Sequence, residues 1–88
     1  MNIVTTVEAA RGKIRYILFR DSTESGMYSY GITVSSEIFG DAEESTVKDI
    51  SSEKEFTLKL LFLLADNLVL PSTLDEVVEE YLAAAFTV

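Results

Sequence analysis

Alternating apolar and polar positions predict β-strands in the first half of the chain. The clearest alternation runs through residues 28–35, where large apolar side chains at every second position are separated by small or polar ones. A period of two is typical of a strand that buries one face. Weaker alternation predicts strands at residues 3–8, 13–20 and 43–50, with glycine-containing or polar turns between them. Strands joined by short turns pair antiparallel, so the pattern favours a four-stranded meander.

Two of these strands have unusual positions. In the strand at residues 13–20, the basic side chains of Lys13 and Arg15 share a face with two apolar residues nearer its end. We therefore expect a central strand whose far face is covered only at one end, or by another molecule. Gly31, in the middle of its strand, predicts a bulge or the close approach of another backbone. The small residues around Gly31 form either an ordinary solvated face or a docking surface.

A long apolar segment, residues 52–70, predicts a helix that is buried on more than one side. Its apolar residues form two adjacent helical stripes, and Ser52 with Glu55 matches the capping box that starts many helices. Pro71 cannot continue the helix, and the apolar run is too short for a membrane span, which needs about 20 residues. A second amphipathic pattern predicts a last helix at residues 74–85.

The order of these elements predicts an α+β fold. A four-stranded antiparallel meander would pack one face on a C-terminal pair of helices. The 88 residues are expected to form a single domain, residues 1–88, around one core. The segment 52–70 would then lie between the sheet and the last helix, which explains why it is apolar on two sides.

The chain contains no histidine and no cysteine. These absences exclude disulfides, thiolate metal sites, a cysteine nucleophile and the usual Ser-His-Asp arrangement. An enzyme would have to rely on carboxylates, lysine or tyrosine. We therefore expect a non-enzymatic protein with no catalytic residues, no cofactor and no metal site.

Charge is distributed unevenly along the chain, whose formal net charge is −8. Residues 1–20 carry four basic side chains against one acid, whereas residues 21–88 carry fourteen acids against three lysines. An acidic field of this size repels nucleic acid and attracts basic surfaces. The expected partner is a basic protein, with a nucleic-acid enzyme as the leading candidate, and no direct binding of nucleic acid is expected. The basic residues of the N-terminal hairpin would pair within the molecule or across a dimer.

Two groups of acids are the candidate partner-binding residues. The last helix carries like-charged pairs at i,i+4 that no neighbouring lysine or arginine relieves. The candidates are Asp75, Glu76, Glu79 and Glu80 in this helix, and Asp41, Glu43 and Glu44 near the predicted turn. The alternative for both groups is a solvated acidic surface. A calcium loop has a different order of acids, so a metal-dependent hydrolase built on Asp41 and Glu43 or Glu44 is the least favoured hypothesis.

The two ends of the chain bear on location and assembly. Residues 1–12 lack the basic start and apolar centre of a signal peptide, so a cytoplasmic protein without a membrane segment is expected. Residues 83–88 are uncharged and either finish the core or seed a homodimer. The alternative function is a self-associating regulatory protein, a homodimer through the basic hairpin, the acidic helix or the apolar tail.

Several short motifs resemble a bacterial family of small proteins of unknown function. They extend over residues 14–82 and occupy mostly core and capping positions. They are Tyr30-Gly31-Ile32, Val47, Asp49-Ile50-Ser51, Asn67, Val69, Pro71, Leu74, Val77-Val78-Glu79 and Tyr81-Leu82. This resemblance implies the fold and assigns no catalytic residue. The small size and acidity also resemble, in style, phage-encoded inhibitors that mimic nucleic acid, including anti-CRISPR proteins.

Overall fold

Four antiparallel strands build the first half of the chain. The computed structural model describes residues 1–86. Its strands form one sheet in the order β1-β2-β3-β4, and each neighbouring pair is antiparallel. They are β1 (Asn2–Ala9), β2 (Ile14–Ser22), β3 (Tyr28–Ser36) and β4 (Glu43–Ser51), with a short 3-10 turn, η1 (Ala10–Gly12), between the first two. The predicted meander is therefore confirmed.

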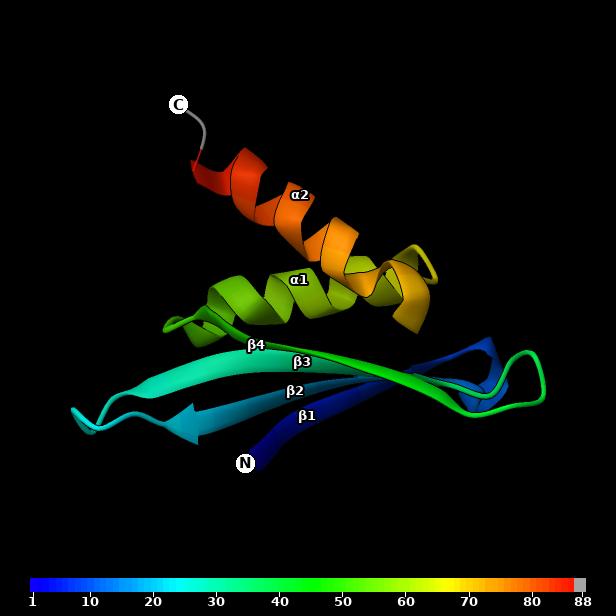
Figure 1. Ribbon diagram of the computed structural model, residues 1–88, viewed down its shortest axis with the longest axis horizontal. Helices are drawn as coiled ribbons and strands as arrows, with labels where there is room; N and C mark the ends of the chain where they lie inside the picture. The colour runs from blue at the N-terminus through cyan, green and yellow to red at the C-terminus, as the bar shows by residue number, and fades with distance from the viewer. Residues whose placement is uncertain (87–88) are drawn as a thin grey trace.

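Two helices follow the sheet and cover one of its faces (Figure 1). They are α1 (Lys54–Asp66) and α2 (Leu74–Phe86), joined through the 3-10 turn η2 (Pro71–Thr73). This arrangement confirms the predicted α+β fold. The buried core lies between the sheet and the helices, and consists mainly of Ile14, Tyr16, Leu18, Ile32, Val34, Leu60, Leu61, Leu64, Leu74 and Val78. The hydroxyl of Tyr16 donates a hydrogen bond of 2.9 Å to the carbonyl of Val69, which ties β2 to the segment between the helices.

The start of α1 differs from the prediction. The helix begins at Lys54 with Glu53 as its N-cap, and no side chain caps it. Strand β4 continues to Ser51, whose hydroxyl accepts a 3.0 Å hydrogen bond from the amide of Glu53. The backbone is thus still extended at the position where a capping box with Ser52 would have placed the first turn, so that prediction is wrong.

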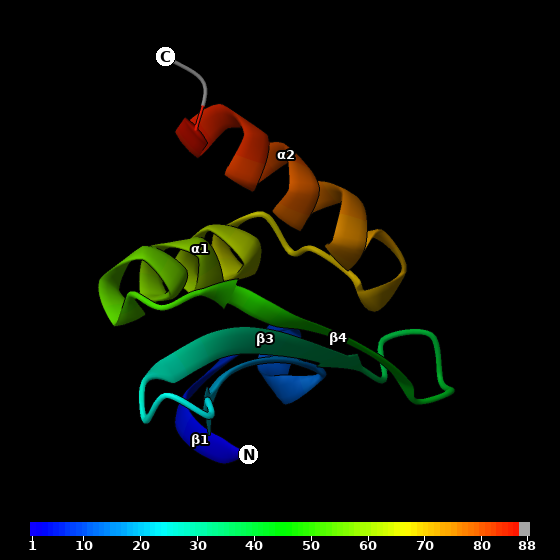
Figure 2. The same ribbon diagram turned by 60° about the vertical axis from the view of Figure 1, so that its left-hand side comes forward.

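Helix α2 inclines away from α1 toward its C-terminal end (Figure 2). Its first turns are anchored by Leu74 and Val78, which are buried, whereas Ala85 on the same stripe is exposed. The helix packs on β4, and one of its links to α1 is the edge-to-face contact of Tyr81 with Phe56, whose ring centroids are 5.2 Å apart. The last helix therefore covers α1 only in part, less than predicted.

As a consequence, part of α1 is left uncovered. Phe62 is 49% exposed and Leu63 is 41% exposed, although both belong to the apolar stripes that predicted burial. The buried face of α1 consists of Thr57, Leu60, Leu61 and Leu64. Only the side of this helix that faces the sheet is fully closed.

No helix of the described chain lies on the far face of the sheet (Figure 1). On this face Phe19 is 1% exposed, whereas Arg15 near the other end of β2, and Lys13 just before the strand, are exposed. The far face is thus covered at one end only, as predicted from the pattern of residues 13–20.

At the covered end of the far face, Gly31 allows Phe19 and β4 to pack closely together. The pairing of β3 with β4 shifts register between Tyr30 and Ile32, so residues 48–50 of β4 bulge opposite Gly31. A Cβ atom on Gly31 would lie 2.5 Å from Cζ of Phe19 and 2.6 Å from the carbonyl oxygen of Val47. The prediction for Gly31 was a bulge or a close backbone approach, and the structure contains both.

Candidate protein-binding surface

The four acids of α2 lie on the side of the helix that faces solvent. Leu74 and Val78 point into the core, which leaves the remaining side of the helix for the charged residues. All four of these acids are exposed, and together we call them the α2 acidic face: Asp75, Glu76, Glu79 and Glu80. The amphipathic pattern of the sequence positions them, because acids and core residues alternate with the helical period.

The α2 acidic face is not neutralised by the basic residues of the described chain. Within residues 1–86, the ion pair present joins the amino group of Met1 to Asp21 at 3.3 Å. The β1–β2 hairpin exposes its basic side chains, and Arg20 instead stacks over the ring of Tyr28 at 4.3 Å. The sheet order explains this separation, since β1 lies at the opposite edge from β4, on which α2 packs. In the described part of the chain, the internal pairing considered for the hairpin is not formed.

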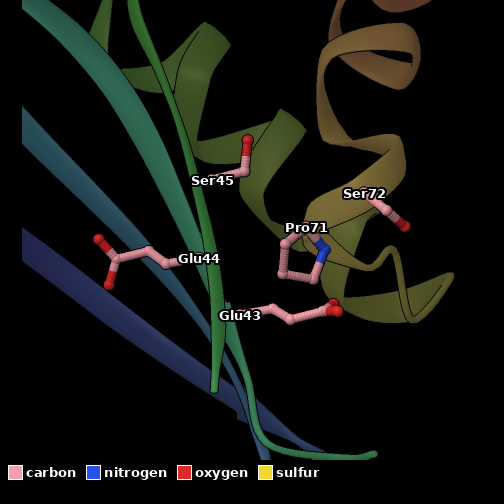
Figure 3. Close-up of a pocket in the computed structure, with 5 residues that line it drawn as sticks. All are labelled: Glu43, Glu44, Ser45, Pro71 and Ser72. Carbon is pink, nitrogen blue, oxygen red and sulfur yellow. The ribbon is translucent and has the colours of Figure 1, made fainter. Parts of the chain in front are cut away.

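The remaining candidate acids lie around the start of β4. A shallow hollow of about 380 Å³ separates β4 from η2, and Figure 3 shows the residues that line it. Glu43 points toward Pro71, whereas Glu44 points to the other side of the strand. Successive residues of a strand point to opposite faces, so the alternation divides this pair. Asp41 lies outside the hollow, in the turn before β4.

The hollow brings Glu43 close to the entrance of α2. Ser72, which also lines it, precedes Asp75 by three residues, and both η2 and α2 pack against β4. Glu43 therefore extends the α2 acidic face onto the edge of the sheet. Glu44 belongs to the far face, in a cross-strand row with Ser35, Arg15 and Glu8.

The described residues contain few features of a reaction centre. Among residues 1–86, no three acids are grouped closely enough to hold a metal ion. Burial raises the pKa of Tyr16, whose hydroxyl is engaged with the Val69 carbonyl inside the core and therefore serves the structure. A second hollow, of about 440 Å³, opens between the start of α1 and Ala85 of α2. What this surface offers chemically is exposed carboxylate charge.

Sequence reasoning missed the exposed apolar surface of α1. A signal was available in α2, whose stripe ends in small alanines after Leu82 and so could not cover a long apolar helix. Ala83, Ala84 and Ala85 of the predicted apolar tail are exposed, whereas the side chain of Phe86 and residues Thr87 and Val88 lie outside the described part of the chain.

Comparison with known proteins gives a family but no activity. No helix in the described chain has the length and apolar character needed to cross a membrane. No curated protein and no solved structure matches the sequence significantly. A family model described as a family of unknown function, DUF6514, matches residues 1–84, a longer stretch than the motifs at residues 14–82 predict. The chain therefore belongs to the DUF6514 family.

Proposed function

We propose that this chain is a non-enzymatic protein-binding module that engages a basic, nucleic-acid-handling protein through the α2 acidic face and inhibits or regulates it. The observation that carries the proposal is that all four acids of this face are exposed and that none has an ion-pair partner within residues 1–86. A surface with unneutralised charge of one sign steers a partner of the opposite sign toward it. The attraction between the two surfaces becomes stronger as the partner excludes water from between them.

The density of this charge is comparable to that of nucleic acid. Residues 75–80 rise about 7.5 Å along the helix and carry four carboxylates, or one charge for about every 2 Å. Duplex DNA carries one charge for about every 1.7 Å. Over roughly one and a half turns, α2 therefore presents to a basic surface a charge density similar to that of a short length of phosphate backbone. In this respect the proposed mode is that of inhibitors that mimic nucleic acid, including anti-CRISPR proteins.

Charge reversal on α2 tests the proposal. The double substitution Glu79→Lys, Glu80→Lys reverses two charges of the face, and Glu24→Lys, Glu55→Lys makes the same change of net charge at two exposed acids outside α2. The tagged proteins are used to capture partners from lysate at low and moderately high salt, followed by identification of what is bound. We expect the wild type and the Glu24/Glu55 variant to retain the same basic nucleic-acid-handling protein at low salt only, because salt screens exposed charges.

The Glu79/Glu80 variant should lose about tenfold or more in affinity, since each exposed charge pair contributes about 0.2–1 kcal/mol and reversal turns attraction into repulsion. Equal loss in both variants would show that net charge, and not the α2 acidic face, governs binding. Capture that is insensitive to both salt and reversal would rule the proposal out.

A further inference from the structure

Strand β1 forms an edge of the sheet with few of the usual protections of an edge strand. Within residues 1–86 no strand lies on its outer side, and it carries one charge, Glu8, and no proline. Its single register shift lies between Ile3 and Thr5, so residues 5–9 remain regular. The other edge, β4, is bulged at residues 48–50, carries charged residues along its length and is packed by η2 and α2. Long, uncharged and regular edges readily pair with another strand.

The apolar core is also unfinished at the β1 edge. Val4, Val7 and Ala9 pack against the core cluster but are only half-buried. A strand placed beside β1 would cover the remaining surface of these side chains.

An apolar flank of α1 lies on the same side of the molecule. Leu58, Phe62 and Ala65 share one flank of α1, because residues four and seven apart lie on the same side of a helix. The opposite flank carries Phe56, which contacts Tyr81 of α2, and α2 lies over β4. The flank with Leu58, Phe62 and Ala65, which we call the α1 flank, is therefore directed toward β1. Leu58 and Ala65 are half-buried, and Phe62 is 49% exposed.

We propose that β1 pairs antiparallel with β1 of a second copy of this chain about a two-fold axis, which joins the two sheets and brings the two α1 flanks together above them. An extended peptide would occupy the strand edge but would leave Phe62 exposed. A second copy presents both a strand edge and an apolar helix flank on one side, and a two-fold axis matches each patch with itself.

The charge layout is compatible with this pairing. In a two-fold register centred on Val7, Glu8 lies opposite Thr6 of the second copy, so the two glutamates do not meet. The α2 acidic face lies over the opposite edge of the sheet and stays exposed. The dimer therefore presents two acidic faces. The dimer proposal does not depend on the proposed protein-binding function.

Sedimentation of matched variants tests the dimer. Phe62→Glu places a charge on the α1 flank, and Leu63→Glu places the same charge on the next residue, which is similarly exposed but lies away from that flank. Across low to high micromolar concentrations, we expect the wild type and Leu63→Glu to dimerise alike and Phe62→Glu to dissociate about tenfold more readily or to stay monomeric. Circular dichroism verifies that both variants fold, as expected for substitutions at exposed positions.

In sedimentation, three results would overturn the inference. They are a wild type that stays monomeric throughout, equal weakening by both substitutions, and a dimer that high salt dissociates, which would point to an electrostatic interface. A mixed sample of two differently isotope-labelled wild-type chains gives a second test, since intermolecular nuclear Overhauser contacts should join Val7 or its strand neighbours across the axis. A dimer without contacts between the β1 strands would also contradict the proposal.

Discussion

At the scale of single residues, Gly31 determines how closely β2, β3 and β4 pack. Its absent side chain makes room for both the Phe19 ring and the Val47 carbonyl. Gly31→Ala should therefore lower the free energy of unfolding by about 1–3 kcal/mol or more, because a backbone oxygen cannot move aside as a flexible side chain can. Gly26→Ala is a matched control, since Gly26 has a φ of +81° with no atom within 4 Å of the added Cβ, and should lose only about 1 kcal/mol to conformational strain. Urea unfolding compares the two, and equal losses would contradict the packing role.

Tyr16 is the second residue with a measurable role, because its buried hydroxyl satisfies the Val69 carbonyl. Tyr16→Phe leaves that carbonyl without this hydrogen bond and should cost about 1–2 kcal/mol at neutral pH. Burial raises the pKa of Tyr16 in the folded chain, so its ionisation favours unfolding. The wild type should therefore lose stability as the pH rises above about 10, the ordinary tyrosine pKa, and the variant should lose less. Identical pH dependence of urea unfolding in the two proteins would show that Tyr16 is not the group responsible.

At the scale of elements, the α2 acidic face places like charges next to one another on the helix. Asp75 with Glu79 and Glu76 with Glu80 are like-charged i,i+4 pairs on exposed helix positions. Glu79→Lys with Glu80→Lys converts both into attractive pairs, so the free energy of unfolding should rise by about 1 kcal/mol in low salt. Greater stability together with lost partner capture would separate binding from folding. A variant less stable than the wild type would contradict this, because it would mean that Glu79 or Glu80 makes a stabilising contact outside α2.

Most of the helices and strands could be predicted from the sequence. Strand periodicity and the stripe of α2 predicted the sheet and the last helix, because a period of two or of 3.6 is imposed by the backbone itself. Gly31 predicted the bulge because a glycine within a strand often marks a bulge or a close backbone approach. The start of α1 was misplaced because Ser52 and Glu55 match a capping box, whereas β4 continues to Ser51 and leaves Glu53 as the N-cap. The inclination of α2 depends on packing between distant segments, so the only sequence signal for the exposure of Phe62 is the run of small alanines that ends the α2 stripe.

At the scale of the whole molecule, charge is separated across the sheet. The basic β1–β2 hairpin lies at one edge, and the α2 acidic face with Glu43 lies over the other. The sequence indicated this separation through its uneven charge, and the exposure of the acids follows from amphipathicity. Strand alternation separates Glu43 from Glu44, but the sequence could not indicate that Glu43 lies beside Pro71, because the position of η2 against β4 is set by tertiary packing. The proposed basic partner and the proposed second copy would therefore bind at opposite edges of the sheet.

Displacement of nucleic acid from the captured partner would show whether the α2 acidic face occupies the partner's nucleic-acid surface. The partner is loaded with a fluorescently labelled oligonucleotide that it binds, and the chain is added at increasing concentration while anisotropy is followed. If the α2 acidic face occupies the nucleic-acid surface, the wild type and the Glu24/Glu55 variant should displace the label, and the Glu79/Glu80 variant should need at least about tenfold more protein. Displacement by all three proteins at equal concentrations, or binding of the wild type alongside the nucleic acid, would contradict it.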